Sequence, residues 1–268
     1  MKKIIAVTIV SAFLVFLSLF AVNAVIGSQQ KSKQLEISRT LLQHSESLTQ
    51  SVAQTLKNLT TQGCDRDSLD RYRQVKLESR YVADVGFIEK GKIVCTAFWG
   101  KLVNPVPLPE ELHETPRGFL LAQFSRKDFF IGNAAIYNNH IIFTSRYAYD
   151  KFTPVTESYS LSTTTRDLSR TFFSATPELN QQSELNSSLF TLTLTRCSNT
   201  WDLCVIVKHH NAGLASLSPV VFIVLAVILC FIWIAITLFF FRLNEDRFSL
   251  ERTLVKAVIT NTIGVHYQ

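Results

Sequence analysis

The sequence lacks the short motifs that identify most soluble enzymes. It contains no Gly-x-Ser-x-Gly, no Walker loop, no HExxH and no dinucleotide-binding glycine pattern. No CxxC occurs and the histidines do not cluster with the cysteines, so we expect no metal site and no cofactor in this chain. The basic residues form no stripe interleaved with aromatics, which argues against a nucleic-acid partner. We therefore expect no catalytic residue here.

Charge is absent from two long apolar segments, residues 4–26 and 217–241. A membrane-spanning helix needs ~20 apolar residues, and both segments meet that length. The first could instead be a cleaved signal peptide, with Lys2 and Lys3 as its basic start and 22–24 as its cleavage site. Its apolar stretch exceeds the roughly 7–15 residues of such a leader. We therefore favour an uncleaved first span.

The basic residues beside the two spans predict their orientation. Lys2 and Lys3 place the N-terminus in the cytoplasm, and Arg242 and Arg247 do the same for the C-terminus. Basic residues between the spans, such as Lys208, weaken this asymmetry. In a Gram-negative bacterium the chain is then a two-span inner-membrane protein with both termini cytoplasmic. Its predicted parts are a cytoplasmic N-terminus (1–3), a span (4–26), a periplasmic domain (27–214), a second span (215–241) and a cytoplasmic segment (242–268).

The periplasmic domain is predicted to begin with two helices. Apolar residues recur at three- and four-residue steps over 34–59, which predicts an amphipathic helix that continues the first span outward. A second helix is expected over 67–80, with Asp67 or Ser68 as its N-cap.

Strand patterns follow the two predicted helices. Strand–turn–strand patterns cover 81–98 and 133–145, and 188–196 alternates apolar residues with threonine before a return strand at 204–208. Prolines predict a loop over 104–116, and polarity predicts another over 176–187. Leading helices followed by a mostly antiparallel sheet indicate an α+β domain, compatible with a PAS-like sensor.

Four of the five cysteines lie in the predicted periplasmic domain, which suggests disulfides. Three pairings are open, and the order of the residues favours Cys64 with Cys95 and Cys197 with Cys204. The chain-entropy model gives about 3.7 kcal/mol for the larger loop and about 2.5 kcal/mol for the smaller. Stapling alone therefore explains the cysteines, whereas a redox switch needs an accessible or labile bridge. Cys230, in the second span, reads as a small apolar residue.

Several segments resemble the CSS-motif sensor domain of bacterial cyclic-di-GMP phosphodiesterases. They are Gly63-Cys64-Asp65, Leu69 to Arg73, Ser79 to Gly86 and Gly91 to Ala97. In that family the domain lies between two membrane helices and precedes a cytoplasmic EAL domain. The signature Cys-Ser-Ser is Cys95-Thr96-Ala97 here, so the cysteine is retained and both serines are replaced.

The C-terminal segment resembles the start of an EAL domain, with 250–257 as its first helix and 263–268 as its first strand. The Glu-Ala-Leu signature and the later acidic metal ligands are absent from this chain. The resemblance implies that magnesium or manganese, and cyclic-di-GMP itself, would bind only to that missing domain.

The resemblance also implies a regulatory bridge between Cys64 and Cys95, whose redox state biases the enzyme. The bridge between Cys197 and Cys204, which the order of the residues favours, is expected to be structural. The implied partners are the membrane, the periplasmic thiol-oxidation machinery and a second copy of the chain. Two alternatives stay open: a ligand-binding extracytoplasmic sensor, and a membrane-anchored adaptor with inert disulfides.

Overall fold

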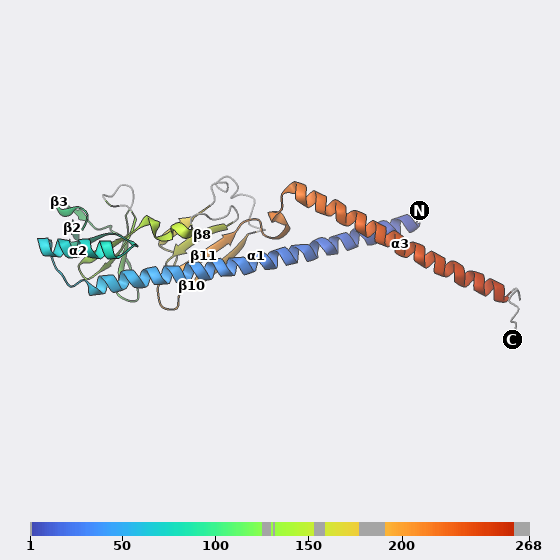
Figure 1. The fold of residues 1–268 in the computed structure, drawn as a ribbon, viewed down its shortest axis with the longest axis horizontal. Coiled ribbons are helices and arrows are strands. Elements are labelled where there is room, and N and C mark those ends of the chain that lie inside the picture. Colours follow the sequence, from blue (N-terminus) through green and yellow to red (C-terminus); the bar gives the residue numbers. More distant parts are fainter. Residues whose placement is uncertain (1, 125–129, 131, 153–158, 177–190, 260–268) are drawn as a thin grey trace. The chain divides into compact units, whose positions relative to one another are not determined.

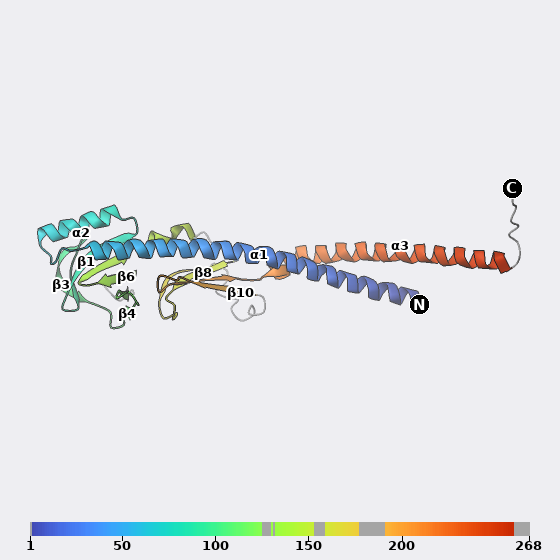
Figure 2. The ribbon, with the colours of Figure 1, turned by 90° about the horizontal axis from the view of Figure 1, so that it is seen from below.

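The computed structural model describes residues 2–259 except 125–129, 131, 153–158 and 177–190. The chain divides into two compact units. One comprises residues 1–30 and 212–268, which contain both predicted spans, and the other comprises residues 31–211. Figure 1 shows the elements of both units along the chain, and Figure 2 shows them from a second direction.

The unit with the predicted spans contains the first half of α1 (Lys2–Asn58), the short 3₁₀ helix η4 (Gly213–Ser216) and α3 (Pro219–Ile259). Both long helices have a stretch apolar and long enough to cross a membrane. Only 11% and 6% of the residues in these stretches are buried, whereas the core helix of a soluble protein would be mostly buried. Phe16 and Phe231 exemplify the large exposed apolar side chains. Both stretches therefore have the surface expected of lipid-facing helices.

Hydrogen bonds join the two long helices inside this unit. Ser11 donates to Thr237 at 3.1 Å, and the indole Nε1 of Trp233 donates to Ser18 at 2.9 Å. Further out, Asn23 Oδ1 accepts the Leu214 N–H at 2.9 Å. Such polar contacts hold helices together where lipid supplies no hydrophobic drive between them.

The other unit is an α+β domain, as predicted. Its seven-stranded sheet has the order β3-β2-β1-β7-β6-β5-β4, and its four-stranded sheet has the order β10-β11-β8-β9. Every paired strand is antiparallel. The larger sheet consists of β1 (Val82–Glu89), β2 (Lys92–Thr96), β3 (Gly100–Pro107), β4 (His113–Glu114), β5 (Leu120–Phe124), β6 (Gly132–Tyr137) and β7 (His140–Thr144). The smaller consists of β8 (Tyr159–Thr164), β9 (Thr171–Ala175), β10 (Leu192–Cys197) and β11 (Cys204–His209).

Residues 31–58 of α1, called here its outer half, belong to this unit and cover both sheets (Figures 1 and 2). Its buried residues, among them Leu41 and Leu56, share one apolar cluster with Val85 of β1 and Val205 of β11. A second cluster lies on the opposite face of the seven-stranded sheet. The neighbours Ile141 and Ile142 belong to different clusters, so β7 is buried on both faces. The α1 helix is continuous from the predicted span into this domain, as the sequence predicts.

Two details of the predicted elements are wrong. The second helix, α2 (Arg66–Glu78), begins one residue earlier than predicted, because the Asp65 side chain accepts the Ser68 N–H and is its N-cap. The predicted loop over 104–116 contains the end of β3 and all of β4. Pro105 and Pro107 fit a strand here because β3 is at the sheet edge, where a missing N–H costs no ladder hydrogen bond. The predicted loop over 177–187 and strand residues 188–190 lie outside the described residues.

Candidate functional site

The structure contains both disulfides that the order of the cysteines favours. Cys64 is bonded to Cys95 with 5.9 Å between the Cα atoms, and Cys197 is bonded to Cys204 with 3.9 Å between them. The first bridge ties the connection between α1 and α2 to strand β2. The second lies across β10 and β11, whose register places the two cysteines directly opposite each other. Their roles as a regulatory and a structural bridge stay predictions.

Cys95 lies in a tightly packed part of the seven-stranded sheet. Its side chain is fully buried, whereas Cys64 is partly exposed. A Cβ added to Gly86, on the neighbouring strand β1, would lie 2.7 Å from the Cys95 carbonyl oxygen. Only glycine therefore fits at position 86 without a shift of the backbone. Of the two bridged cysteines, Cys64 is thus the one in contact with solvent.

The chain segment that contains Cys64 is also anchored by two buried side chains. His140 Nε2 lies 2.6 Å from the Thr61 carbonyl oxygen, so this nitrogen carries the proton and donates it. Tyr72 donates from its hydroxyl to the Gly63 carbonyl at 3.2 Å. Burial raises the pKa of Tyr72, which keeps the phenol protonated and able to donate. These bonds hold Cys64 beside β2 independently of the disulfide.

The residue after Cys95 retains one hydroxyl of the CSS signature. Thr96 is fully buried, and its Oγ1 accepts the Trp99 N–H at 3.1 Å. The buried carboxylate of Asp84 accepts the N–H groups of Val85 at 2.9 Å and Phe98 at 3.0 Å. Burial raises the pKa of Asp84, and a hydrogen bond from the Thr96 side chain opposes that rise. Thr96 and Asp84 thus fix the turn that follows the cysteine.

The Cys197–Cys204 bridge closes a short loop that contacts α1. Cys197 is exposed and Cys204 is buried. Inside the loop, the Ser198 hydroxyl donates to Glu46 Oε1 at 2.5 Å and accepts the Trp201 N–H at 3.1 Å. The bridge therefore constrains the loop whose Ser198 connects the smaller sheet to Glu46 of α1.

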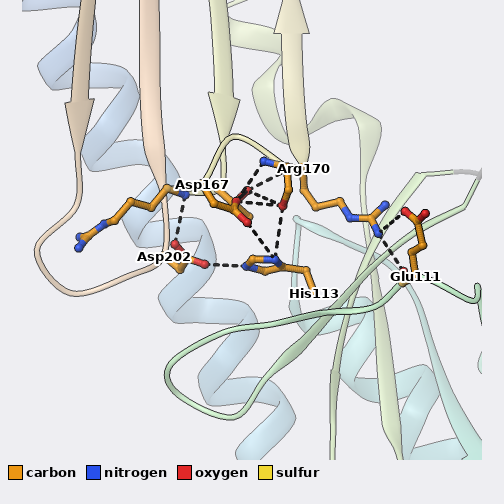
Figure 3. Close-up of polar contacts among 8 residues, drawn as sticks. Glu111, His113, Asp167, Arg170 and Asp202 are labelled. Carbon is orange, nitrogen blue, oxygen red and sulfur yellow. Dashed lines mark hydrogen bonds and ion pairs between the residues drawn. The ribbon is translucent and has the colours of Figure 1, made fainter.

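A polar cluster links this loop to the larger sheet (Figure 3). His113, in β4, lies with its Nε2 2.7 Å from Asp202 Oδ2 and with its Nδ1 3.7 Å from Asp167 Oδ2. Asp167 is in the turn between β8 and β9, where hydrogen bonds from Thr165 and Ser169 and the charge of His113 lower its pKa to about 2. Arg170 adds a 3.1 Å ion pair with Glu111. One histidine thus contacts both hairpin turns, β8–β9 and β10–β11, which lie at the same end of the smaller sheet.

Sequence reasoning identified the four cysteines but missed the groups around them. Asp84 had a visible signal, since it is the only charged residue inside the apolar run 82–88. His113 and Asp202 are 89 residues apart and gave none. Among the described residues, no group of three or more His, Cys, Asp or Glu side chains could hold a metal ion.

Comparisons with known proteins place the domain in a family. The extracellular domain of rpHK1S-Z16, described as a histidine kinase, has 10% identity and a TM-score of 0.39, and the match covers 68% of this chain and 95% of that chain. This likeness is too low to assign a function. No curated protein matches the chain. A family model described as the CSS motif domain associated with EAL matches residues 33–218, which is more than half of the chain. The chain therefore belongs to the family of CSS-motif domains associated with EAL.

Proposed function

We propose that this chain is the redox-sensing regulatory region of a membrane-bound cyclic-di-GMP phosphodiesterase, with its CSS-motif domain in the periplasm. The observation that most supports this is the Cys64–Cys95 bridge at the CSS signature of a family associated with EAL domains. The two long apolar helices support attachment to the inner membrane, and the basic residues beside them support cytoplasmic termini. The hydrogen bonds of Ser11 and Ser18 to α3 support an uncleaved first span.

The bridge is suited to a reversible change. Cys64 is partly exposed and can be attacked by a thiolate, while Tyr72 and His140 keep its chain segment in place after reduction. After reduction the two thiols then stay close to each other, so the thiol-oxidation machinery can form the disulfide again. The signal is a change in the relative stability of two arrangements of the domain, which α1 and α3 pass to the cytoplasm, with the chain acting as a homodimer.

The first test measures thiol occupancy in intact cells. Free thiols are alkylated and each cysteine is mapped by mass shift, with and without the periplasmic oxidation machinery. We expect Cys64 and Cys95 to be bridged in oxidising cells and free when oxidation fails. Bridging of both under every condition would make the bond structural and overturn the redox role.

The second test measures the output. The chain is joined through its C-terminus to an active EAL domain, and cyclic-di-GMP hydrolysis is compared between wild type and the Cys64→Ser/Cys95→Ser variant. We expect hydrolysis to differ between them and to become insensitive to reductant in the variant. The matched control is Cys197→Ser/Cys204→Ser, which should keep the reductant response. A response lost only in this control would assign the sensing role to the other bridge.

A further inference from the structure

The α+β domain contains a cavity of about 830 Å³, and neither Cys64 nor Cys95 is among its described lining residues. It lies between the outer half of α1, the strands β6 and β9, and the loop that the Cys197–Cys204 bridge closes. This volume is in the range of about 300–1,000 Å³ that small-molecule sites occupy. The redox function proposed above makes no use of this space.

Most of the cavity wall is apolar. Leu48, Val52 and Leu56 line it from α1, and Phe119 and Phe172 line it from the sheet side. Tyr149 and Phe173 also line it and stack on each other with 4.5 Å between ring centroids. A wall of this kind favours a ligand with a hydrocarbon or aromatic body.

Two arginines give the cavity a positive edge. The Arg117 guanidinium lies 4.2 Å from the centre of the Trp201 ring, and Arg166 donates through Nη2 to the Ser198 carbonyl at 2.6 Å. Within the described part of the chain, neither guanidinium has a carboxylate partner. Each therefore keeps N–H donors for an anion, in the geometry that binds carboxylates well.

The one acidic residue among the described lining residues does not compete for these donors. Asp202 Oδ1 accepts the backbone N–H of Arg166 at 3.1 Å, and Oδ2 contacts His113 Nε2 at 2.7 Å. Its charge is thus bound to His113 and to the backbone. The side chains of Arg117 and Arg166 remain for a ligand.

We propose that this cavity binds an amphipathic organic anion, a compact apolar body with one carboxylate. The apolar body lies against α1 and the aromatic wall, and the carboxylate pairs with Arg117 and Arg166. The disulfide-closed loop supplies Trp201 and orients both arginines, so reduction of Cys197–Cys204 should weaken binding. The proposal concerns a different bridge and a different input from the redox function above.

The test uses the full chain in lipid nanodiscs and isothermal titration calorimetry. The probes are 4-phenylbutyrate and 4-phenyl-1-butanol, which share the apolar body and differ in charge. We expect the carboxylate to bind at least roughly tenfold more tightly than the alcohol, the effect of one or two charge-assisted hydrogen bonds. Arg117→Gln/Arg166→Gln should remove that difference. Arg71→Gln, an exposed α2 arginine whose side chain bonds only Gln74 among the described residues, is the matched control.

A second variant tests the location of the site. Ala53→Leu adds bulk at a buried lining position of α1 and should abolish binding of both probes. Both disulfides, mapped by mass spectrometry, verify that the variant is folded. Equal affinity for the two probes, no effect of the arginine substitutions, or no binding at millimolar probe concentration would each overturn the proposal. None of these outcomes would bear on the redox state of Cys64 and Cys95.

Discussion

At the scale of single residues, the surroundings of Cys95 are organised by buried groups. Asp84 and Thr96 hold the turn after the cysteine, and Gly86 lets β1 approach the cysteine's carbonyl oxygen. Thr96 replaces the first serine of the signature without loss of the hydroxyl, while Ala97 replaces the second and is buried. A buried hydroxyl and a small buried residue thus follow the cysteine.

Replacement of Gly86 by alanine is expected to destabilise the domain. The new Cβ would lie 2.7 Å from the Cys95 carbonyl oxygen, so β1 or β2 must shift, at a cost of about 1–3 kcal/mol. Urea unfolding of the oxidised protein measures this. Gly91→Ala is a useful comparison, because no described atom beyond its chain neighbours lies within 4 Å of its added Cβ, and its strain comes from the positive φ of +72°. Equal stability of Gly86→Ala and wild type would contradict the close packing.

Acidification is expected to destabilise the domain partly through His44. Burial lowers the pKa of His44 below 6.5, and its Nε2 donates to the Ala148 carbonyl at 2.6 Å. Between the lowered folded-state pKa and 6.5 the unfolded chain binds more protons, so stability falls as the pH drops through this window. His44→Gln keeps a donor and removes the titration. Thermal unfolding across the window should show a smaller loss in the variant, and an equal loss in both proteins would exclude His44.

At the scale of secondary-structure elements, local patterns predict the hairpins but not which strands of different hairpins pair with each other. The turns at Lys90-Gly91 and Asn138-Asn139 were visible because left-handed backbone favours glycine and asparagine, and Lys90, Gly91 and Asn138 all have positive φ. The pairing of β1 with β7 was invisible, because it joins strands more than 50 residues apart. The edge position of β3 follows from the order of the whole sheet, which local patterns do not give, so the sequence alone predicts a loop at its prolines.

The short helix η4 is bound to α1 at a position that only glycine allows. Gly213 has φ +69°, and its N–H donates to Gln30 Oε1 at 2.7 Å. A Cβ there would lie 2.1 Å from Asn23 Oδ1, which accepts the Leu214 N–H.

Gly213→Ala should therefore break the contacts of α1 with η4, at a cost of about 1–3 kcal/mol. Hydrogen exchange of the Leu214 amide in nanodiscs should accelerate accordingly. Gly27→Ala in α1 is the control and should leave that amide unchanged, because no described atom beyond the chain neighbours and the helix's own backbone lies within 4 Å of the added Cβ. Slow exchange at Leu214 in both variants would show that the contacts survive.

At the scale of the whole molecule, the two bridges differ in access. Cys197 is exposed, whereas Cys95 and Cys204 are buried and Cys64 is only partly exposed. Thiol–disulfide exchange requires a reachable sulfur. The sequence predicted the pairs through their order but not this difference, because exposure depends on the packing of sheets that the sequence pattern does not place.

Graded reduction should therefore open the bridges in a fixed order. With increasing dithiothreitol, alkylation and mass mapping should label Cys197 and Cys204 before Cys64 and Cys95. Reduction of Cys64–Cys95, the second step, should lower the free energy of unfolding more than the first step does. The chain-entropy model assigns about 3.7 kcal/mol to its larger loop and about 2.5 kcal/mol to the smaller. Tyr72→Phe serves as a comparison. It removes the hydrogen bond to the Gly63 carbonyl and should lower the dithiothreitol concentration at which Cys64–Cys95 is reduced. Labelling of Cys64 first would show that access does not set the order.

The sequence separations of the bridges, 31 and 7 residues, have a consequence for how the protein is made. Each disulfide joins one cysteine to the next along the chain, and no other cysteine lies between the partners. An oxidant that acts on a chain emerging from a translocation channel meets Cys64 and Cys95 before Cys197 has appeared. Pairing in order of emergence then gives the native set directly. We therefore expect biogenesis of this domain to need an oxidase but no isomerase to correct mispaired thiols.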